Sequence, residues 1–316
     1  MESKVRRLNV LPSHPEFAVE EQAVGPGRFP SWLHRKLPKG SVLNQTGTIL
    51  SGNRVYTVCE EAKCPNLLEC WSRKTATFLV MGKECTRSCG FCDIDFSKAP
   101  KPLEMDEPYR VAQAVKELGL RHVVITMVAR DDLEDGGSAH LIKVIEEIRL
   151  INEAATIELL TSDFNGNSSA LTAVLKALPD IFNHNIETVR SLTPRVRNKA
   201  TYLRTLAVLE QASSQRINRK MKVKSGLMLG LGETENEVYE TLDDLKNAGC
   251  DIVTIGQYLQ PNRRKLSVKK FIPPDQFKKY EEYGLKIGIP YLYCGPFVRS
   301  SYNADVILEN LRNHDA

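Results

Sequence analysis

Apolar segments of strand length alternate with amphipathic helical segments along most of the chain. The first apolar segment spans residues 75–82. Residues 107–118 then repeat apolar side chains at i, i+3, i+4 and i+7, and Gly119 ends this pattern. Five more strand-like segments, each followed by a helical pattern, lie at residues 122–126, 156–162, 180–185, 223–230 and 251–256. Strand–helix alternation repeated six times predicts an α/β fold with a parallel sheet.

The number of strand–helix units favours a curled sheet. No GxGxxG sequence follows the first strand, as a dinucleotide-binding fold would require. Six units are two fewer than a closed eightfold barrel contains. We therefore predict a partial, TIM-like (β/α)6 barrel over residues 75–288. Residues 1–74 show little periodicity and are expected to form an irregular N-terminal extension, and residues 289–316 a C-terminal segment.

Polar motifs follow the predicted strands at the points where these strands end. The sequence ECTRSCGFC follows the first strand, and the later strands are followed by RDDLEDGG, SDFNGN, NHNIE, GLGETE and GQYLQP. The carboxyl ends of parallel strands meet at one face of a barrel, where barrel enzymes build their sites. The sequence therefore predicts one active site assembled from these loops.

Composition changes this picture little. Hydrophobic residues make up 42% of the 316 residues, the net charge is +4, and no apolar run is long enough to span a membrane. The first residues carry charges without a following apolar segment, so no secretory signal is expected and the predicted location is cytoplasmic. We expect neither a nucleic acid nor a membrane as a partner.

Six of the eight cysteines lie between Cys59 and Cys92, in two groups of three. In a reducing compartment, cysteines grouped in this way are more often metal ligands than disulfides. The other two, Cys250 and Cys294, stand alone in apolar surroundings and are expected to be small buried side chains.

The loop after the first strand contains the spacing Cys85-x3-Cys89-x2-Cys92. This spacing matches neither paired C-x2-C units nor mixed cysteine–histidine zinc sites, whereas close runs of thiolates are typical of iron–sulfur clusters. A cubane has four irons, so three cysteines leave one iron without a protein ligand. Catalytic metal sites keep such an open position, which predicts that a further molecule binds there.

This spacing, with Phe91 directly before the third cysteine, resembles the radical S-adenosylmethionine (SAM) superfamily. The resemblance implies a 4Fe–4S cluster whose open iron binds SAM, with a 5′-deoxyadenosyl radical as the reactive species. The sequence GLMLGLGE resembles a glycine-rich segment that contacts SAM in this superfamily, which makes Gly226, Gly230 and Glu233 candidate cofactor contacts. Asn185, in the sequence FNHNIETV, and Phe91 are further candidate cofactor contacts.

The second group of cysteines, Cys59-x4-Cys64-x5-Cys70, lies in the extension that lacks a core of its own. A bound cluster would help such a segment to fold, as metals do in small domains. A metal with a purely structural role would do the same and is the alternative.

Eight motifs along the chain resemble the lipoyl synthase family. They are CEEAKCPNLLEC, ECTRSCGFC, RDDLEDGG, DFNGN, FNHNIETV, SGLMLGLGET, CDIVTIGQYLQP and GPFVRSSY. The resemblance implies an auxiliary 4Fe–4S cluster that is held by Cys59, Cys64, Cys70 and a serine of RSSY. This serine is taken here as Ser301, with Ser300 as the alternative. Oxygen is a harder donor than sulfur and holds an iron–sulfur cluster less favourably, as a cluster consumed as a sulfur source requires.

The implied reaction inserts two sulfur atoms, at C6 and C8, into an octanoyl group on a lysine of a lipoyl carrier domain. The implied carriers are the E2 subunits of 2-oxoacid dehydrogenases and the glycine cleavage H protein. A reductant such as ferredoxin or flavodoxin, and an iron–sulfur cluster carrier, complete the expected partners. Asp131, Asp132, His184 and Glu187 are candidate contacts without assigned roles. The basic residues 262–270 are either a docking surface for an acidic carrier or an ordinary solvated face.

Two other interpretations stay open. Another sulfur-inserting radical SAM enzyme is the nearest, although biotin-synthase-like proteins lack the N-terminal cysteine triplet. Methylthiotransferases carry a C-terminal RNA-binding domain, for which the expected domains leave no room. From a different class, the chain could be an iron–sulfur electron carrier or scaffold, which iron and sulfide analysis together with a test of SAM cleavage would separate from an enzyme.

Overall fold

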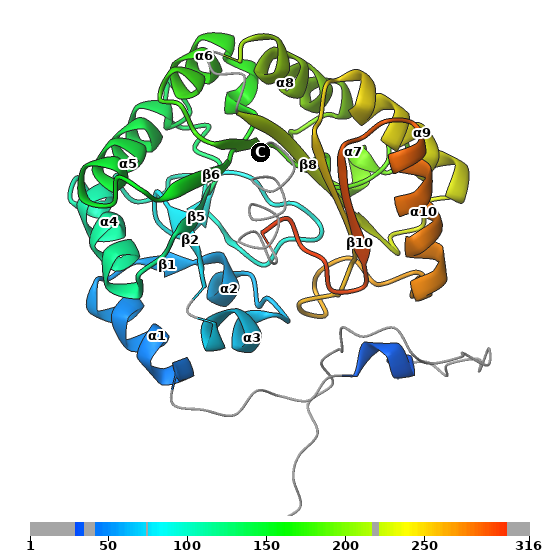
Figure 1. The fold of residues 1–316 in the computed structure, drawn as a ribbon, viewed down its shortest axis with the longest axis horizontal. Helices are drawn as coiled ribbons and strands as arrows, with labels where there is room; N and C mark the ends of the chain where they lie inside the picture. The colour runs from blue at the N-terminus through cyan, green and yellow to red at the C-terminus, as the bar shows by residue number, and fades with distance from the viewer. Residues whose placement is uncertain (1–28, 35–41, 74, 217–220, 302–316) are drawn as a thin grey trace, which may run out of the picture.

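A curled sheet of eight strands forms the centre of the computed structural model, which describes residues 29–34, 42–73, 75–216 and 221–301. The strand order is β1-β2-β5-β6-β7-β8-β9-β10, and helices form an outer ring around the sheet (Figure 1). Strand β1 pairs with β2 in antiparallel fashion, and all other neighbours in this sheet are parallel. The strands are β1 (Tyr56–Thr57), β2 (Thr77–Val80), β5 (His122–Met127), β6 (Thr156–Leu160), β7 (Ile181–Asn183), β8 (Lys222–Leu229), β9 (Ile252–Gln257) and β10 (Tyr291–Gly295).

Ten α-helices are found among the described residues. They are α1 (Val42–Gly52), α2 (Val58–Glu61), α3 (Leu67–Ser72), α4 (Glu107–Leu118), α5 (Ser138–Ile151), α6 (Ser168–Lys176), α7 (Thr193–Val196), α8 (Tyr202–Ser214), α9 (Glu235–Asn247) and α10 (Pro274–Lys286). Two short 3-10 helices, η1 (Ser31–Leu33) and η2 (Phe164–Gly166), and a second, two-stranded sheet of β3 (Glu84–Cys85) and β4 (Asp95–Phe96) complete the elements.

The predicted parallel α/β fold is confirmed, and the six predicted strands are β2, β5, β6, β7, β8 and β9. The sheet is open, with β1 and β10 at its two edges. Strand β10 was not predicted, because its five residues follow α10 without a further strand–helix unit among the described residues. It pairs in register with β9, where Cys294 lies beside Ile255.

Local signals explain why the helices begin and end where they do. Helix α4 has a proline in its first turn and ends at Gly119, whose φ of 67° is the left-handed conformation that glycine adopts without strain. Helix α9 begins with a capping box, in which the Thr234 hydroxyl accepts from the Glu237 amide and the Glu237 carboxylate accepts from the Thr234 amide. The apolar faces of these helices pack on a core that runs through the sheet.

The expectation of an irregular N-terminal extension is wrong for the described part of residues 1–74. Helices α2 and α3 lie between the sheet edges β1 and β10, and α1 packs outside them against α3 and α4 (Figure 1). In α1, Thr46 and Leu50 are buried and lie four residues apart on one face of the helix. Because one of the two is polar, the hydrophobic pattern of the sequence does not distinguish this helix from a loop. The rest of the extension, residues 1–28 and 35–41, lies outside the described residues.

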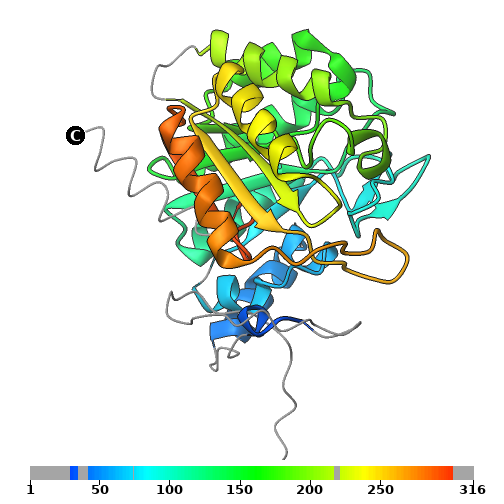
Figure 2. The same ribbon diagram turned by 90° about the vertical axis from the view of Figure 1, so that its right-hand side faces the viewer.

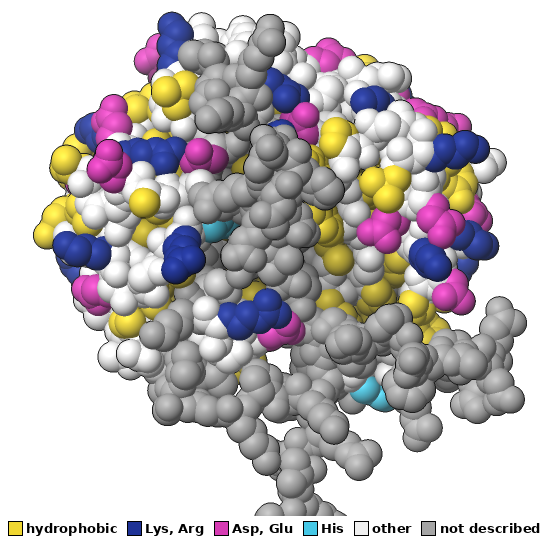
Figure 3. Space-filling model, in the orientation of Figure 1, with side chains coloured by type: hydrophobic (Ala, Val, Ile, Leu, Met, Phe, Trp, Pro, Cys, Tyr) yellow, Lys and Arg dark blue, Asp and Glu magenta, His cyan; other side chains and the backbone are white. Residues whose placement is uncertain are grey.

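The loops that carry polar motifs project from one side of the barrel. In Figure 2, the segment around β3 and β4 and the loop after β9 both project on the right-hand side. On the face shown in Figure 3, basic and acidic side chains are interspersed around the ring of helices, as on an ordinary solvated surface. Among the described residues, no helix has both the length and the apolar character needed to cross a membrane.

Candidate active site

A cavity of about 540 Å³ opens at the carboxyl ends of the strands and contains both cysteine groups. All six of these cysteines line it, together with Ser300 and Ser301 from the other end of the chain. Apolar side chains form much of the remaining wall, and they include Val58, Leu79, Met127, Leu160, Leu227 and Met228. The two cysteine groups and the RSSY serines, far apart in sequence, therefore share one space.

Backbone hydrogen bonds fix the loop that carries Cys85, Cys89 and Cys92. Thr86 bonds the loop after β5 twice, because its amide and its hydroxyl both donate to the Ala129 carbonyl, at 3.0 and 2.9 Å. The Gly90 amide donates to the Val196 carbonyl at 2.9 Å. A Cβ atom at Gly90 would come within 2.9 Å of Leu266, so glycine permits this close approach. These hydrogen bonds connect the loop to the segment after β5 and to α7.

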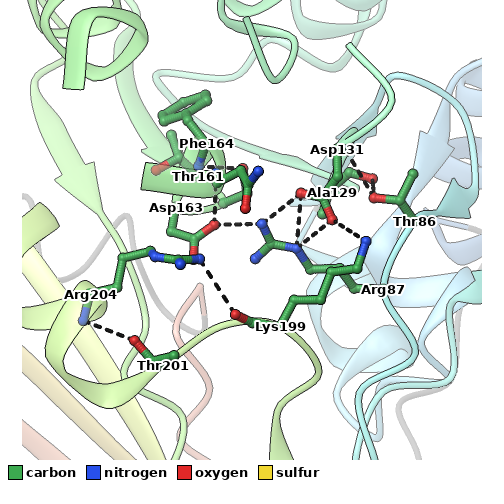
Figure 4. A network of polar contacts seen from close by, with 12 residues as sticks. Thr86, Arg87, Ala129, Asp131, Thr161, Asp163, Phe164, Lys199, Thr201 and Arg204 are labelled. Atoms are coloured by element: carbon green, nitrogen blue, oxygen red, sulfur yellow. Dashed lines mark hydrogen bonds and ion pairs between the residues drawn. The ribbon is translucent and has the colours of Figure 1, made fainter. Parts of the chain in front are cut away.

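Arg87, within this cysteine loop, is the centre of a buried ion network (Figure 4). Its Nη2 atom lies 2.7 Å from Asp131 Oδ1 and 2.6 Å from Asp163 Oδ1. Lys199 Nζ lies 3.2 Å from the other Asp131 oxygen, and Arg204 Nη1 lies 3.3 Å from the other Asp163 oxygen. Burial alone would raise the pKa of Asp163, but the hydrogen bonds from Arg87 outweigh it and hold that pKa at about 2. The network thus joins the cysteine loop to the loops after β5 and β6.

Four of the six cysteine thiols at the cavity are in surroundings that disfavour the free thiolate. Burial raises the pKa of both Cys70 and Cys92 to about 12, and it also raises the pKa of Cys59 and Cys89. Nucleophilic cysteines have lowered pKa values, so these thiols are not arranged for covalent catalysis. Buried thiolates need a bound cation, and two sets of three soft donors fit iron–sulfur clusters.

The second cysteine group is attached both to the first group and to the C-terminal segment. Lys63, between Cys59 and Cys64, lies with its Nζ 2.7 Å from Oδ2 of Asp93, the residue after Cys92. Asn66, between Cys64 and Cys70, is 1% exposed and donates from Nδ2 to the Phe297 carbonyl at 2.8 Å. The ion pair thus links the two cysteine loops, and the Asn66 hydrogen bond links the second loop to the C-terminal segment.

The C-terminal segment runs across β9 at a glycine. A Cβ atom at Gly256 would lie 2.0 Å from the carbonyl oxygen of Val298, so no larger residue fits there without displacing the backbone. Two residues further along, Ser300 Oγ donates to Asn185 Oδ1 at 2.9 Å and accepts from Asn183 Nδ2 at 2.8 Å. Ser301 then lines the cavity, and Tyr302 lies outside the described residues.

Replacing Gly256 by alanine is expected to displace the segment that carries Ser301. The added methyl group meets backbone rather than a mobile side chain, so we expect a loss of about 1–3 kcal/mol in the free energy of unfolding. Urea denaturation measures this loss. Gly52→Ala is the matched control, since nothing lies within 4 Å of the added methyl group and its stability should not fall. Equal stability of the two variants would contradict the packing described here.

The structure brings three of the five candidate SAM contacts to the cavity. Phe91, Asn185 and Gly226 line it, whereas Gly230 and Glu233 are not among its lining residues. The Glu233 carboxylate accepts hydrogen bonds from the amides of residues 230, 231 and 232, and so closes its own loop. Gly230 has a φ of 98° and packs against Gln257 and the Lys270 carbonyl, which explains the glycine by backbone conformation and close packing.

The four candidates without assigned roles fall into two groups. Asp131 and Asp132 are paired with arginines, Arg87 and Arg130 respectively, and are not among the cavity-lining residues. His184 and Glu187 line the cavity. Burial lowers the pKa of His184 to about 4, so this imidazole is neutral at physiological pH, and burial raises the pKa of Glu187.

Several residues that shape the site were not predicted from the sequence; they include Arg87, Asp163, Asn183 and Arg197. Arg87 and Asp163 lie within the quoted motifs ECTRSCGFC and DFNGN, so a charged residue without an assigned role in such a motif was the available signal. Arg197 lines the cavity and donates from Nη1 to Thr205 Oγ1 at 2.6 Å. No sequence pattern distinguishes it from a surface arginine.

Comparisons with known proteins agree with this geometry. Residues 79–245 match the model of the Radical SAM superfamily. The structure is similar to SuiB of Streptococcus suis bound to S-adenosylmethionine, with a TM-score of 0.55 and 12% identity over 76% of this chain and 56% of that one. It is also similar to HydG, a maturase of the [FeFe]-hydrogenase, with a TM-score of 0.52 and 16% identity over 74% and 61% of the two chains. The fold and the cysteine-lined cavity thus define a radical SAM enzyme.

Sequence relatives specify the family within that class. The chain is 69% identical over 313 residues to lipoyl synthase of Protochlamydia amoebophila, a match that covers 99% of this chain and 97% of the relative. It is 52% identical over 290 residues to lipoyl synthase of Chlamydia trachomatis serovar D, which covers 92% of each. The chain belongs to the lipoyl synthase family.

The family settles the activity at this level. The enzyme inserts sulfur at C6 and C8 of octanoyl groups on lipoyl carrier proteins, and it uses SAM, a 4Fe–4S cluster and a reductant.

Proposed function

We propose that Cys85, Cys89 and Cys92 hold the 4Fe–4S cluster that binds SAM. The proposal is supported by their common position at the cavity and by the burial that raises the pKa of Cys89 and Cys92, which disfavours free thiolates there. Arg197 lies beside this group, since the amide of the following residue donates to Cys89 Sγ at 3.4 Å. Its guanidinium offers a positive charge for the carboxylate of SAM, with Phe91, Asn185 and Gly226 as further contacts.

A second, auxiliary 4Fe–4S cluster is assigned to Cys59, Cys64, Cys70 and Ser301. The choice between the two RSSY serines rests on their hydrogen bonds. The Ser300 hydroxyl already makes two hydrogen bonds, since it donates to Asn185 and accepts from Asn183. The Ser301 hydroxyl lines the cavity and makes no hydrogen bond with another described residue, so it is the serine that is free to bind iron.

The cavity suits an eight-carbon acyl chain. Its volume is within the usual range for small-molecule sites, and leucine, valine and methionine side chains supply an apolar wall. When bound, SAM and its cluster supply a radical that removes hydrogen, and the auxiliary cluster supplies the sulfur. The chain's own residues hold both groups on one cavity, place the acyl chain between them and exclude water. The shared cavity is the observation that carries this proposal.

The proposed macromolecular partners follow from the substrate. They are the octanoylated domains of 2-oxoacid dehydrogenase E2 subunits and the glycine cleavage H protein, a ferredoxin or flavodoxin as reductant, and an iron–sulfur cluster carrier. All eight cysteines are free of disulfides, which fits a reducing compartment and the proposed cytoplasmic location.

Anaerobic incubation of the reconstituted protein with SAM, a reductant and an octanoyl-lysine peptide tests this function. Mass spectrometry should show two sulfur atoms in place of two hydrogen atoms, together with methionine and 5′-deoxyadenosine. Formation of 5′-deoxyadenosine without sulfur in the peptide would identify a different radical reaction. Binding of a single cluster in fully loaded protein would exclude the auxiliary site.

A further inference from the structure

Ser300 attaches the C-terminal segment to the opposite wall of the barrel. Its hydroxyl bonds Asn183, the last residue of β7, and Asn185, two residues beyond it. The segment itself continues from β10, which is separated from β7 in the sheet by β8 and β9. The Ser300 hydroxyl therefore uses both its donor and its acceptor capacity to attach the segment to the end of β7 and the loop after it.

The attachment point is rigid because a buried ion pair supports it. The Asn183 amide that bonds Ser300 also donates to Glu158 Oε1 at 2.7 Å, and both Glu158 oxygens lie 2.9 Å from Lys224 Nζ. All three side chains are fully buried. A buried charge is costly when it loses its partner, so this arrangement strongly resists rearrangement. Ser300 is thereby linked to β6, β7 and β8.

Two further contacts hold the same segment from other directions. Asn66, from the second cysteine loop, donates to the Phe297 carbonyl, and Val298 lies directly on Gly256. Neither of these contacts, nor those of Ser300, involves a cysteine sulfur or the Ser301 hydroxyl. These contacts therefore hold the segment through atoms other than the proposed cluster ligands.

We propose that Ser300 is a positioning residue that keeps Ser301 at the auxiliary site whether or not iron is bound there. The inference rests on the assignment of Ser301 as the oxygen ligand. Consecutive Cα atoms are 3.8 Å apart, so fixing Ser300 limits how far Ser301 can move from the cavity. With a cluster bound, a rotamer change of Ser301 would suffice to release its oxygen from iron, and without a cluster the hydroxyl would stay near the site.

Iron retention tests the role of Ser300 directly. Fully loaded Ser300→Ala protein should lose its auxiliary iron to a chelator about 10-fold faster than the wild type, because residues that orient a ligand contribute this much to metal affinity. Ser300→Thr keeps the hydroxyl and should restore slow loss. Ser168→Ala removes an exposed serine hydrogen bond to Gln211 and should behave as the wild type. Equal rates of iron loss for Ser300→Ala and the wild type would overturn the proposal.

Proteolysis of the wild-type protein provides a measurement that does not depend on a variant. Trypsin cleaves after Arg299, and mass spectrometry detects peptides that begin at Ser300. We expect this bond to be cleaved equally slowly in iron-free and iron-loaded protein. Cleavage that becomes fast only in the iron-free protein would show that the cluster, and not Ser300, holds the segment, and would overturn the inference.

Different results would contradict the proposed auxiliary cluster and the proposed role of Ser300. If the loaded wild-type protein holds only about four irons instead of about eight, the auxiliary cluster itself is absent and the proposed function fails. If it holds about eight, and Ser300→Ala retains them as the wild type does, the auxiliary cluster stands and only the positioning role fails.

Discussion

Cys64→Ala is expected to abolish lipoyl formation while 5′-deoxyadenosine continues to form, since Cys64 is a proposed ligand of the auxiliary cluster and not of the SAM-binding cluster. The variant should hold about four irons instead of about eight, the content of one cubane. Cys92→Ala should also hold about four irons, but it should form neither product, because no radical is generated without the first cluster. Iron analysis and mass spectrometry of the reaction mixture measure all three quantities.

Cys250→Ala is the control for the loss of a cysteine. This thiol is 2% exposed in the core and does not line the cavity, so the variant should keep about eight irons and both products. If Cys64→Ala stopped 5′-deoxyadenosine formation as completely as Cys92→Ala does, the division of the six cysteines into two independent groups would be wrong.

Arg87→Met is expected to destabilise the loop of the first cysteine group severely. The Arg87 side chain is 6% exposed and the Asp163 side chain 0% exposed, so the substitution leaves a carboxylate buried beside an apolar group. Removing one partner of a buried ion pair costs about 3–5 kcal/mol. Arg204 and Lys199 stay close to the two aspartates and reduce this cost, so we expect about 3 kcal/mol in the free energy of unfolding of the iron-free protein.

Urea denaturation of the iron-free Arg87→Met protein measures this loss. Lys278→Met is the matched control, because Lys278 pairs with Glu282 at 4.0 Å with both side chains largely exposed. Its free energy of unfolding should change by less than about 0.5 kcal/mol. Loaded Arg87→Met protein should also show a reduced content of the first cluster. A loss in Arg87→Met no larger than in Lys278→Met would show that the ion network does not hold the loop.

Local patterns predicted the parts of this protein that depend on neighbouring residues. The cysteine spacing identifies both groups because cluster ligands lie close together in sequence, and the strand–helix alternation identifies six strands of the sheet. Helix α1 was not predicted, because only one of its described buried side chains, Thr46 and Leu50, is apolar. Strand β10 was not predicted, because a five-residue strand without a following helix does not show the strand–helix alternation that identified the others.

The supporting contacts of the site could not be predicted because they join distant residues. Arg87 meets Asp163 across 76 positions of sequence, and Asn183 meets Ser300 across 117. Many pairs of polar residues that are distant in sequence could form such contacts, and the arrangement of the strands in the curled sheet determines which pairs meet. Gly230 and Glu233 stay predicted SAM contacts, although the Glu233 carboxylate bonds the amides of its own loop and neither residue lines the cavity.

The opening between β1 and β10 has a consequence for biosynthesis. Asn66 reaches the Phe297 carbonyl across 231 positions of sequence, and the helices that fill the opening come from the first part of the chain to be translated. This hydrogen bond cannot form until residue 297 has left the ribosome, long after the cysteines have emerged. The proposed auxiliary site therefore cannot be complete before residue 301 has been synthesised, and a cluster that needs all four proposed ligands can be delivered only after that point.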